Sequence, residues 1–130
     1  MVDLTAATVL ARFNYDSTAF DPDRDETASL TNVEYIIDDA IDFVNAEAGT
    51  SISNLAGVAG SKTVTLTAAQ NAPIKLILSV MLKETKYKIS TSSSLGPASA
   101  SETVGGQDAI FRKMFWQSIG RLQGRSFLVT

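Results

Sequence analysis

The sequence predicts a mostly α-helical fold, and three observations lead to this class. Apolar residues recur with the spacing of an amphipathic helix in four separate stretches. One short stretch alternates apolar residues with threonine, as a β-strand does. The chain has 130 residues, of which 45% are apolar, which suits a single domain with one core. We therefore expect a small four-helix domain with a minor β-hairpin or strand, two long loops and an extended C-terminal tail.

The first helix is expected at residues 4–13, where Ala6, Val9, Leu10 and Phe13 share one face and Asp3 precedes them as N-cap. The stretch that follows, residues 14–30, is polar, contains a proline and shows no period. It predicts a long loop, and such loops in small domains are usually functional or mobile.

The second helix is expected to begin at Thr31, because Thr31-x-x-Glu34 has the form of a capping box. Gly49 is its expected C-cap. Its core face carries apolar residues at helical spacing: Val33, Ile36, Ile37, Ala40, Ile41, Val44 and Ala48. Its opposite face carries Glu34, Asp38, Asp42 and Asn45, with Tyr35 among them.

The acidic face of this helix has three interpretations. Solvation by water is the simplest. An interface with a basic partner is the main alternative for Glu34, Asp38 and Asp42, because like charges at i, i+4 repel each other in an isolated helix. Acid–base catalysis would need carboxyl groups in different environments or a histidine partner, which one polar helix face does not supply.

Residues 62–67 predict a short strand, which is expected to pair with residues 51–55 as a minor hairpin. The third helix is expected to run to residue 89. It begins either at the capping-box pattern Thr67-x-x-Gln70 or near Asn71, because Pro73 is better placed in a first turn. Apolar residues wrap most of this helix and leave a strip of Lys75, Ser79, Lys83 and Lys86, so we expect it at the centre of the domain.

Residues 90–106 are rich in Ser, Ala and Gly and predict a flexible excursion within one domain, residues 1–124. The fourth helix is expected over 107–123 and ends at Gly124. Its apolar arc contains Ile110, Phe111, Met114, Phe115, Ile119 and Leu122. Trp116 lies outside this arc, near Arg112. It is either an interface anchor or a cover for loop 90–106. Arg112 and Arg121 are further interface candidates on this helix.

The tail, residues 125–130, has the composition of a strand. It is too short for a hairpin but long enough to add to the edge of a sheet, in its own domain or in a neighbour. We expect Arg125, Phe127, Leu128 and Val129 to contact another subunit or a partner.

Composition excludes several classes of function. The chain has no Cys and no His, which excludes disulfides, zinc sites built on thiolate or imidazole, and catalysis that uses either residue. The net charge of −3 gives no global basic field for nucleic acid. We expect no enzyme activity, no cofactor, no metal and no membrane span, and synthesis in the cytoplasm, because neither a signal peptide nor a long apolar run is evident.

Two stretches resemble ligand-binding loops without matching them. Asp21, Asp23 and Asp25 hold the first, third and fifth positions of a calcium loop, but Glu26 and Asn32 stand where glycine and a bidentate glutamate are required. "GVAGSKT" at 57–63 has too few residues between its glycines for a phosphate-binding loop, and a serine precedes its lysine. Weak cation binding by the acidic loop stays open.

The order of elements resembles the head–tail connector (adaptor or head-completion) proteins of tailed bacteriophages. The resemblance rests on a short first helix, "NVEYIIDDAIDFVNAEAG", "APIKLILSVMLKETKYKIS", a Gly/Ser loop and the terminal "FRKMFWQSIGRLQGRSFLVT". It implies a virion protein at the head–tail interface, without enzymatic activity, present in the host cytoplasm during assembly. Its copies would form a ring, commonly dodecameric in the family, that binds the portal protein, extends the DNA channel and docks the next tail-proximal or stopper component.

The competing function is a small regulatory or DNA-binding helical module. Lys75, Lys83, Lys86 and Lys88 of the third helix are available for phosphate contacts. The chain shows no helix-turn-helix pattern with a short glycine turn, and its overall charge is acidic.

Overall fold

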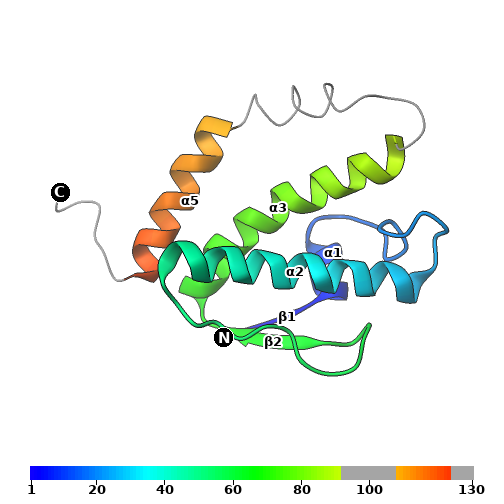
Figure 1. Ribbon diagram of the computed structural model, residues 1–130, viewed down its shortest axis with the longest axis horizontal. Helices are drawn as coiled ribbons and strands as arrows, with labels where there is room; N and C mark the ends of the chain where they lie inside the picture. Colours follow the sequence, from blue (N-terminus) through cyan, green and yellow to red (C-terminus); the bar gives the residue numbers. More distant parts are fainter. Residues whose placement is uncertain (92–107, 124–130) are drawn as a thin grey trace.

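The computed structural model describes residues 1–91 and 108–123, and side chains for 1–89 and 112–123. These residues form β1 (Val2–Thr5), α1 (Ala6–Arg12), α2 (Glu26–Ala48), β2 (Thr63–Leu66), α3 (Ala68–Thr91) and α5 (Asp108–Leu122) (Figure 1). The predicted fold class, four helices with a minor β element, is confirmed. The predicted excursion over 90–106 begins too early, because residues 90 and 91 belong to α3. Its remaining residues, the C-cap at Gly124 and the tail at 125–130 lie outside the described residues.

The two strands pair antiparallel, with Val2 opposite Leu66 and Thr5 opposite Thr63. The predicted pairing of this strand with residues 51–55 is wrong, and only a single bridge joins Ala56 to Thr63 on that side. The reason is that side chains of α2 bind the backbone of residues 52–55, as described below, which leaves the edge of β2 to the N-terminal strand.

The first helix begins later than its apolar spacing suggests, because residues 2–5 belong to the sheet. Thr5, not Asp3, is the N-cap, and it forms a capping box with Thr8: each hydroxyl accepts a hydrogen bond from the other residue's backbone N–H (3.1 and 3.0 Å). Asp3 instead accepts a hydrogen bond from the hydroxyl of Thr65 across the sheet (2.7 Å). The predicted cap at Asp3 is therefore wrong.

The second helix begins earlier than predicted, with Asp25 as N-cap and the Ala28 N–H donating to its carboxylate (3.0 Å). The Thr31 hydroxyl donates to the carbonyl of Thr27 inside the helix (2.9 Å), so the predicted capping box at Thr31 is wrong. The preceding loop stabilises this earlier start of the helix, because the buried Ser29 accepts a hydrogen bond from the N–H of the fully buried Phe20. Gly49 is confirmed as the C-cap, with φ of 69°.

The third helix begins at the first of the two predicted positions. The Thr67 N–H donates to Gln70 Oε1 (2.9 Å) and the Gln70 N–H donates to Thr67 Oγ1 (3.2 Å), which completes the capping box. Pro73 is accommodated inside the helix, and a start near Asn71 is excluded.

The core lies where α2 packs against α1, α3 and α5 and where α3 packs against α2 and α5, so α2 shares the central position that the sequence assigned to the third helix. α3 packs mainly against α2 and α5 through one buried stripe: Ile74, Ile77, Leu78 and Leu82. Phe115 and Ile119 bury the inner side of α5. Met114, predicted on the same arc, is 48% exposed, while the side chains of Ile110 and Phe111 lie outside the described residues.

Candidate interaction surfaces

A polar stripe of α2 binds the backbone of the segment that follows the helix. Glu34, Asp38 and Asn45 occupy this stripe at helical spacing. The Leu55 N–H donates to Asp38 (2.9 Å), and the Ile52 N–H donates to the Asn45 side chain (2.8 Å), whose amide donates back to the Ile52 carbonyl (2.9 Å). Asp42 adds a bond from the Asn54 side chain (3.2 Å). The stripe therefore fixes residues 50–62 along one side of α2.

Glu34 forms the innermost contact of this stripe. Its side chain is only 2% exposed, and its two carboxylate oxygens accept the N–H groups of Gly60 and Lys62, each at 2.9 Å. The prediction that Glu34 lies on a solvated face is wrong, because the chain returns over it. All three acidic interface candidates, Glu34, Asp38 and Asp42, thus accept hydrogen bonds within their own chain, and Glu34 is the one that is buried.

The glycine-bearing stretch that resembles a phosphate loop curls around this carboxylate. Gly57 and Gly60 have φ of 124° and 90°, which L side chains rarely adopt. Such a turn directs backbone N–H groups toward an anion, and here the anion is Glu34. A fixed turn results, with Val58 at 78% exposure.

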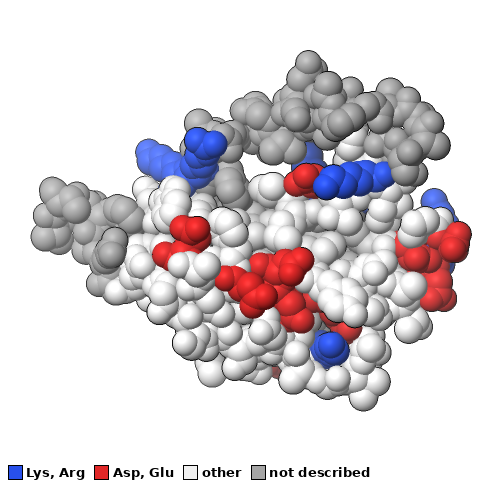
Figure 2. Space-filling view, in the orientation of Figure 1, with Lys and Arg blue, Asp and Glu red and all other residues white. Residues whose placement is uncertain are grey.

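The outer stripe of α2, defined here as Asp39, Phe43 and Glu47, borders solvent beside the buried face of the helix. Asp39 and Glu47 are exposed, and Phe43 is 45% exposed between them. The described residues offer neither carboxylate a hydrogen bond or an ion pair. Acidic side chains gather along α2 in Figure 2.

An aromatic cluster joins this stripe to α5. The ring of the buried Phe115 contacts Phe43 at a centroid distance of 5.7 Å and Trp116 at 5.3 Å. Trp116 is 48% exposed, so it lies off the core face as its spacing predicts. The alternative that it covers loop 90–106 involves residues outside the described ranges.

Basic residues occupy the outer surface of α5, where Arg112, Lys113 and Arg121 are exposed. Figure 2 shows Lys and Arg side chains at one end of this helix, apart from the acidic side chains along α2. The remaining interface candidates, Arg125, Phe127, Leu128 and Val129, lie outside the described residues.

The acidic loop before α2 uses its carboxylates for local structure. Asp21 accepts the Asp25 N–H (3.0 Å), and Asp25 caps the helix. Asp16 accepts the backbone N–H and the hydroxyl of Thr18, and these bonds, helped by the charge of Arg24, lower the pKa of Asp16 below its ordinary value. Among the described residues, no group of three or more His, Cys, Asp or Glu is arranged to hold a metal.

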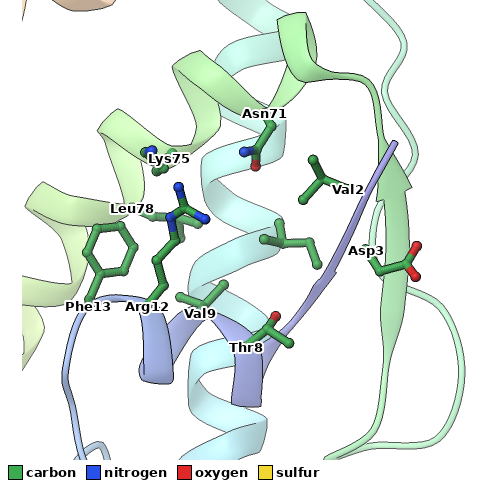
Figure 3. A pocket seen from close by; sticks show the side chains of 10 residues that line it. Val2, Asp3, Thr8, Val9, Arg12, Phe13, Asn71, Lys75 and Leu78 are labelled. Carbon is green, nitrogen blue, oxygen red and sulfur yellow. The ribbon is translucent and has the colours of Figure 1, made fainter.

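A basic pocket of about 90 Å³ opens between β1, α1 and α3 (Figure 3). Its apolar lining is Val2, Leu4, Val9, Phe13 and Leu78. Arg12 of α1 extends toward α3, where Lys75 lies, whereas the Asp3 carboxylate points away toward β2. No carboxylate in the described part of the chain pairs with either cation.

Sequence reasoning missed the basic pocket because it depends on the strand. Residues 2–5 were expected partly in a helix, whereas in the sheet Val2 and Leu4 form one wall of the pocket. Lys75 was placed on the polar strip of its helix, but nothing local connects it with Arg12. The signal was the alternation of Val2 and Leu4 with polar residues.

Comparisons with protein-family models, curated proteins and solved structures gave no match to this chain. No helix among residues 1–91 and 108–123 is both long and apolar enough to cross a membrane.

Proposed function

We propose that this chain is a structural virion protein that forms a ring between the portal and the tail of a tailed phage. In this role it extends the DNA channel and docks the next tail component, without catalysing a reaction. The proposal rests on the order of helical elements, which resembles the head–tail connectors, and on a surface suited to contacts between copies.

The observation that carries the proposal is an aromatic cluster on α2 and α5 in which Phe43 and Trp116, each about half exposed, pack on the buried Phe115. Exposed aromatic residues that pack on a buried ring are favourable anchors for a protein interface. Exposed acidic side chains lie along α2, and exposed basic side chains, those of α5 among them, lie on other parts of the surface, so neighbouring copies have complementary charges to offer.

The partners follow from this role: further copies of the chain, the portal protein, and the next tail-proximal or stopper component. DNA passes through the ring without sequence-specific binding. Acidic side chains on the lumen would repel phosphate and let the DNA slide.

The test is retention in virus particles. Tagged full-length chain and the 1–124 truncation are expressed with the intact assembly system, and particles are purified and analysed by mass spectrometry and negative-stain imaging. We expect portal-containing particles with the full-length chain and none with the truncation, whose fold is checked by circular dichroism. Loss of both chains from the particles would refute the proposed function, and uptake of the truncation would refute the role of the tail.

The DNA-binding alternative makes a different prediction. A regulatory module would shift the mobility of duplex DNA near physiological salt, with an affinity that falls steeply as salt rises. A virion protein of the proposed kind gives no such shift.

A further inference from the structure

Two groups of charged residues combine the lack of a hydrogen-bond or ion-pair partner within the described residues with adjacent apolar surface. Asp39 and Glu47 flank Phe43 on the outer stripe of α2, at i, i+4 and i+8. The other group, Arg12 and Lys75, borders an apolar pocket. Each group thus combines charge of one sign with apolar surface.

The two groups face away from each other. The inner face of α2 packs against α1, and α1 with β1 and α3 forms the basic pocket. The outer stripe is turned away from this packing, because at about 100° per residue it lies about a third of a turn around α2 from the side that Val33, Ile37 and Val44 fill. Figure 3 shows α2 behind α1 when the pocket is viewed from its open side. One molecule cannot bring its own stripe to its own pocket.

We propose that the basic pocket receives the outer stripe of a second copy of this chain. The carboxylates of Asp39 and Glu47 meet Arg12 and Lys75 of the neighbour, and Phe43 contacts the apolar lining. A cavity of about 150 Å³ holds a benzene molecule. The pocket of about 90 Å³ therefore takes the leading edge of the Phe43 ring, while the charges meet at its mouth.

The geometry of this contact determines the type of assembly. It joins two different surfaces, so it is heterologous, and every copy keeps one free stripe and one free pocket for the next. Repetition closes into a ring when the rotation between copies allows it. This contact rests on the proposed function for the kind of assembly that forms. It adds to that function the residues that join the subunits.

Disulfide trapping tests the contact directly, because the chain contains no cysteine of its own. Phe43→Cys and Lys75→Cys are made separately in the full chain, and the two proteins are mixed under mild oxidation. We expect at least about tenfold more covalent dimer from the mixture than from either variant alone, because a disulfide requires its two Cβ atoms to lie about 4 Å apart. Val58→Cys, exposed on a different loop, replaces Phe43→Cys in the matched control.

Charge exchange provides a second, independent measurement. One variant carries Arg12→Glu and Lys75→Glu, and another carries Asp39→Lys and Glu47→Lys. Each variant alone should lose self-association by analytical ultracentrifugation, and the equimolar mixture should regain it, since each reversed pocket then meets a stripe of opposite charge. Circular dichroism of each variant checks that the fold is retained.

The outcomes separate this inference from the proposed function. Equal dimer yield with Val58→Cys, or from Phe43→Cys alone, would overturn the stripe-to-pocket contact, even when particles still incorporate the chain. Specific trapping of a protein that never enters particles would support the contact and refute the connector role.

Discussion

At the scale of single residues, Glu34 accounts for the position of an entire loop. A carboxylate that is 2% exposed is costly unless its oxygens are hydrogen-bonded, and Glu34 accepts the N–H groups of Gly60 and Lys62. Glu34→Gln keeps the shape of the side chain but replaces one acceptor by an NH₂ group that faces a donor. We expect a loss of about 2 kcal/mol in the free energy of unfolding, as for hydrogen bonds to a buried charged group.

Urea denaturation followed by circular dichroism measures this loss. Glu47→Gln is the matched control, because Glu47 lies on the same helix and is exposed, so its substitution should change stability by less than about 0.5 kcal/mol. Equal stability of the two variants would contradict the anchoring role of Glu34.

Asp16 makes the stability of the acidic loop depend on pH. Hydrogen bonds from the backbone and side chain of Thr18 lower the pKa of Asp16 from its ordinary value of 3.8. A carboxyl group with a lowered pKa in the folded state contributes stability above its unfolded pKa, and that contribution is lost as the pH falls through the folded pKa. Between about pH 5 and about pH 2, Asp16→Asn should therefore lose less stability than the wild-type protein.

The measurement is a series of urea denaturation curves across this range for the two proteins. Asp23→Asn, at an exposed position of the same loop, controls for the removal of one carboxylate from this region. Identical pH profiles for Asp16→Asn and the wild-type protein would exclude the contribution of Asp16.

At the scale of elements, local patterns predicted which helices exist, and long-range contacts decided where they begin. The capping box at Thr67 and the C-cap at Gly49 are set by neighbouring residues, so they were readable in the sequence. Thr31-x-x-Glu34 has the same local form, yet Glu34 is engaged by a loop far along the chain. β1 likewise depends on residues 63–66, because the short alternation of residues 2–5 forms a strand only when it is paired with them.

Among the candidate surfaces, too, only the features set by local spacing could be predicted from the sequence. The spacing of Trp116 placed it off the core face because helix periodicity fixes that angle. The basic pocket required the pairing of two distant strands, which no local pattern contains.

Two substitutions distinguish the observed start of α2 from the start that its sequence suggests. Asp25→Ala removes the side chain that accepts the Ala28 N–H, so we expect a loss of about 1 kcal/mol in stability. Thr31→Ala removes only a bond to a carbonyl inside the helix and adds a better helix former, so its effect should stay below about 0.5 kcal/mol. Chemical denaturation of both variants checks the order, and a larger loss with Thr31→Ala would place the cap at Thr31.

At the scale of the whole molecule, the aromatic cluster separates the forces that stabilise the fold from those available for assembly. Phe115 is 3% exposed and packs within the core, whereas Trp116, one residue later, is 48% exposed and contacts its ring. Phe115 therefore stabilises the fold, whereas Trp116 is available for contact with a partner. Alanine substitution should mainly lower stability at Phe115 and mainly lower assembly at Trp116.

Phe115→Ala should cost about 3 to 5 kcal/mol of stability, because it leaves a cavity between α5 and α2. Trp116→Ala removes a half-exposed ring and should cost about 1 kcal/mol, yet it should strongly reduce incorporation into particles if Trp116 is an interface anchor. Thermal melting and particle retention are measured on the same preparations, with Lys113→Ala as a surface control on α5. A loss above about 3 kcal/mol for Trp116→Ala would assign it to the core, and full incorporation of a stable Trp116→Ala protein would remove it from the interface.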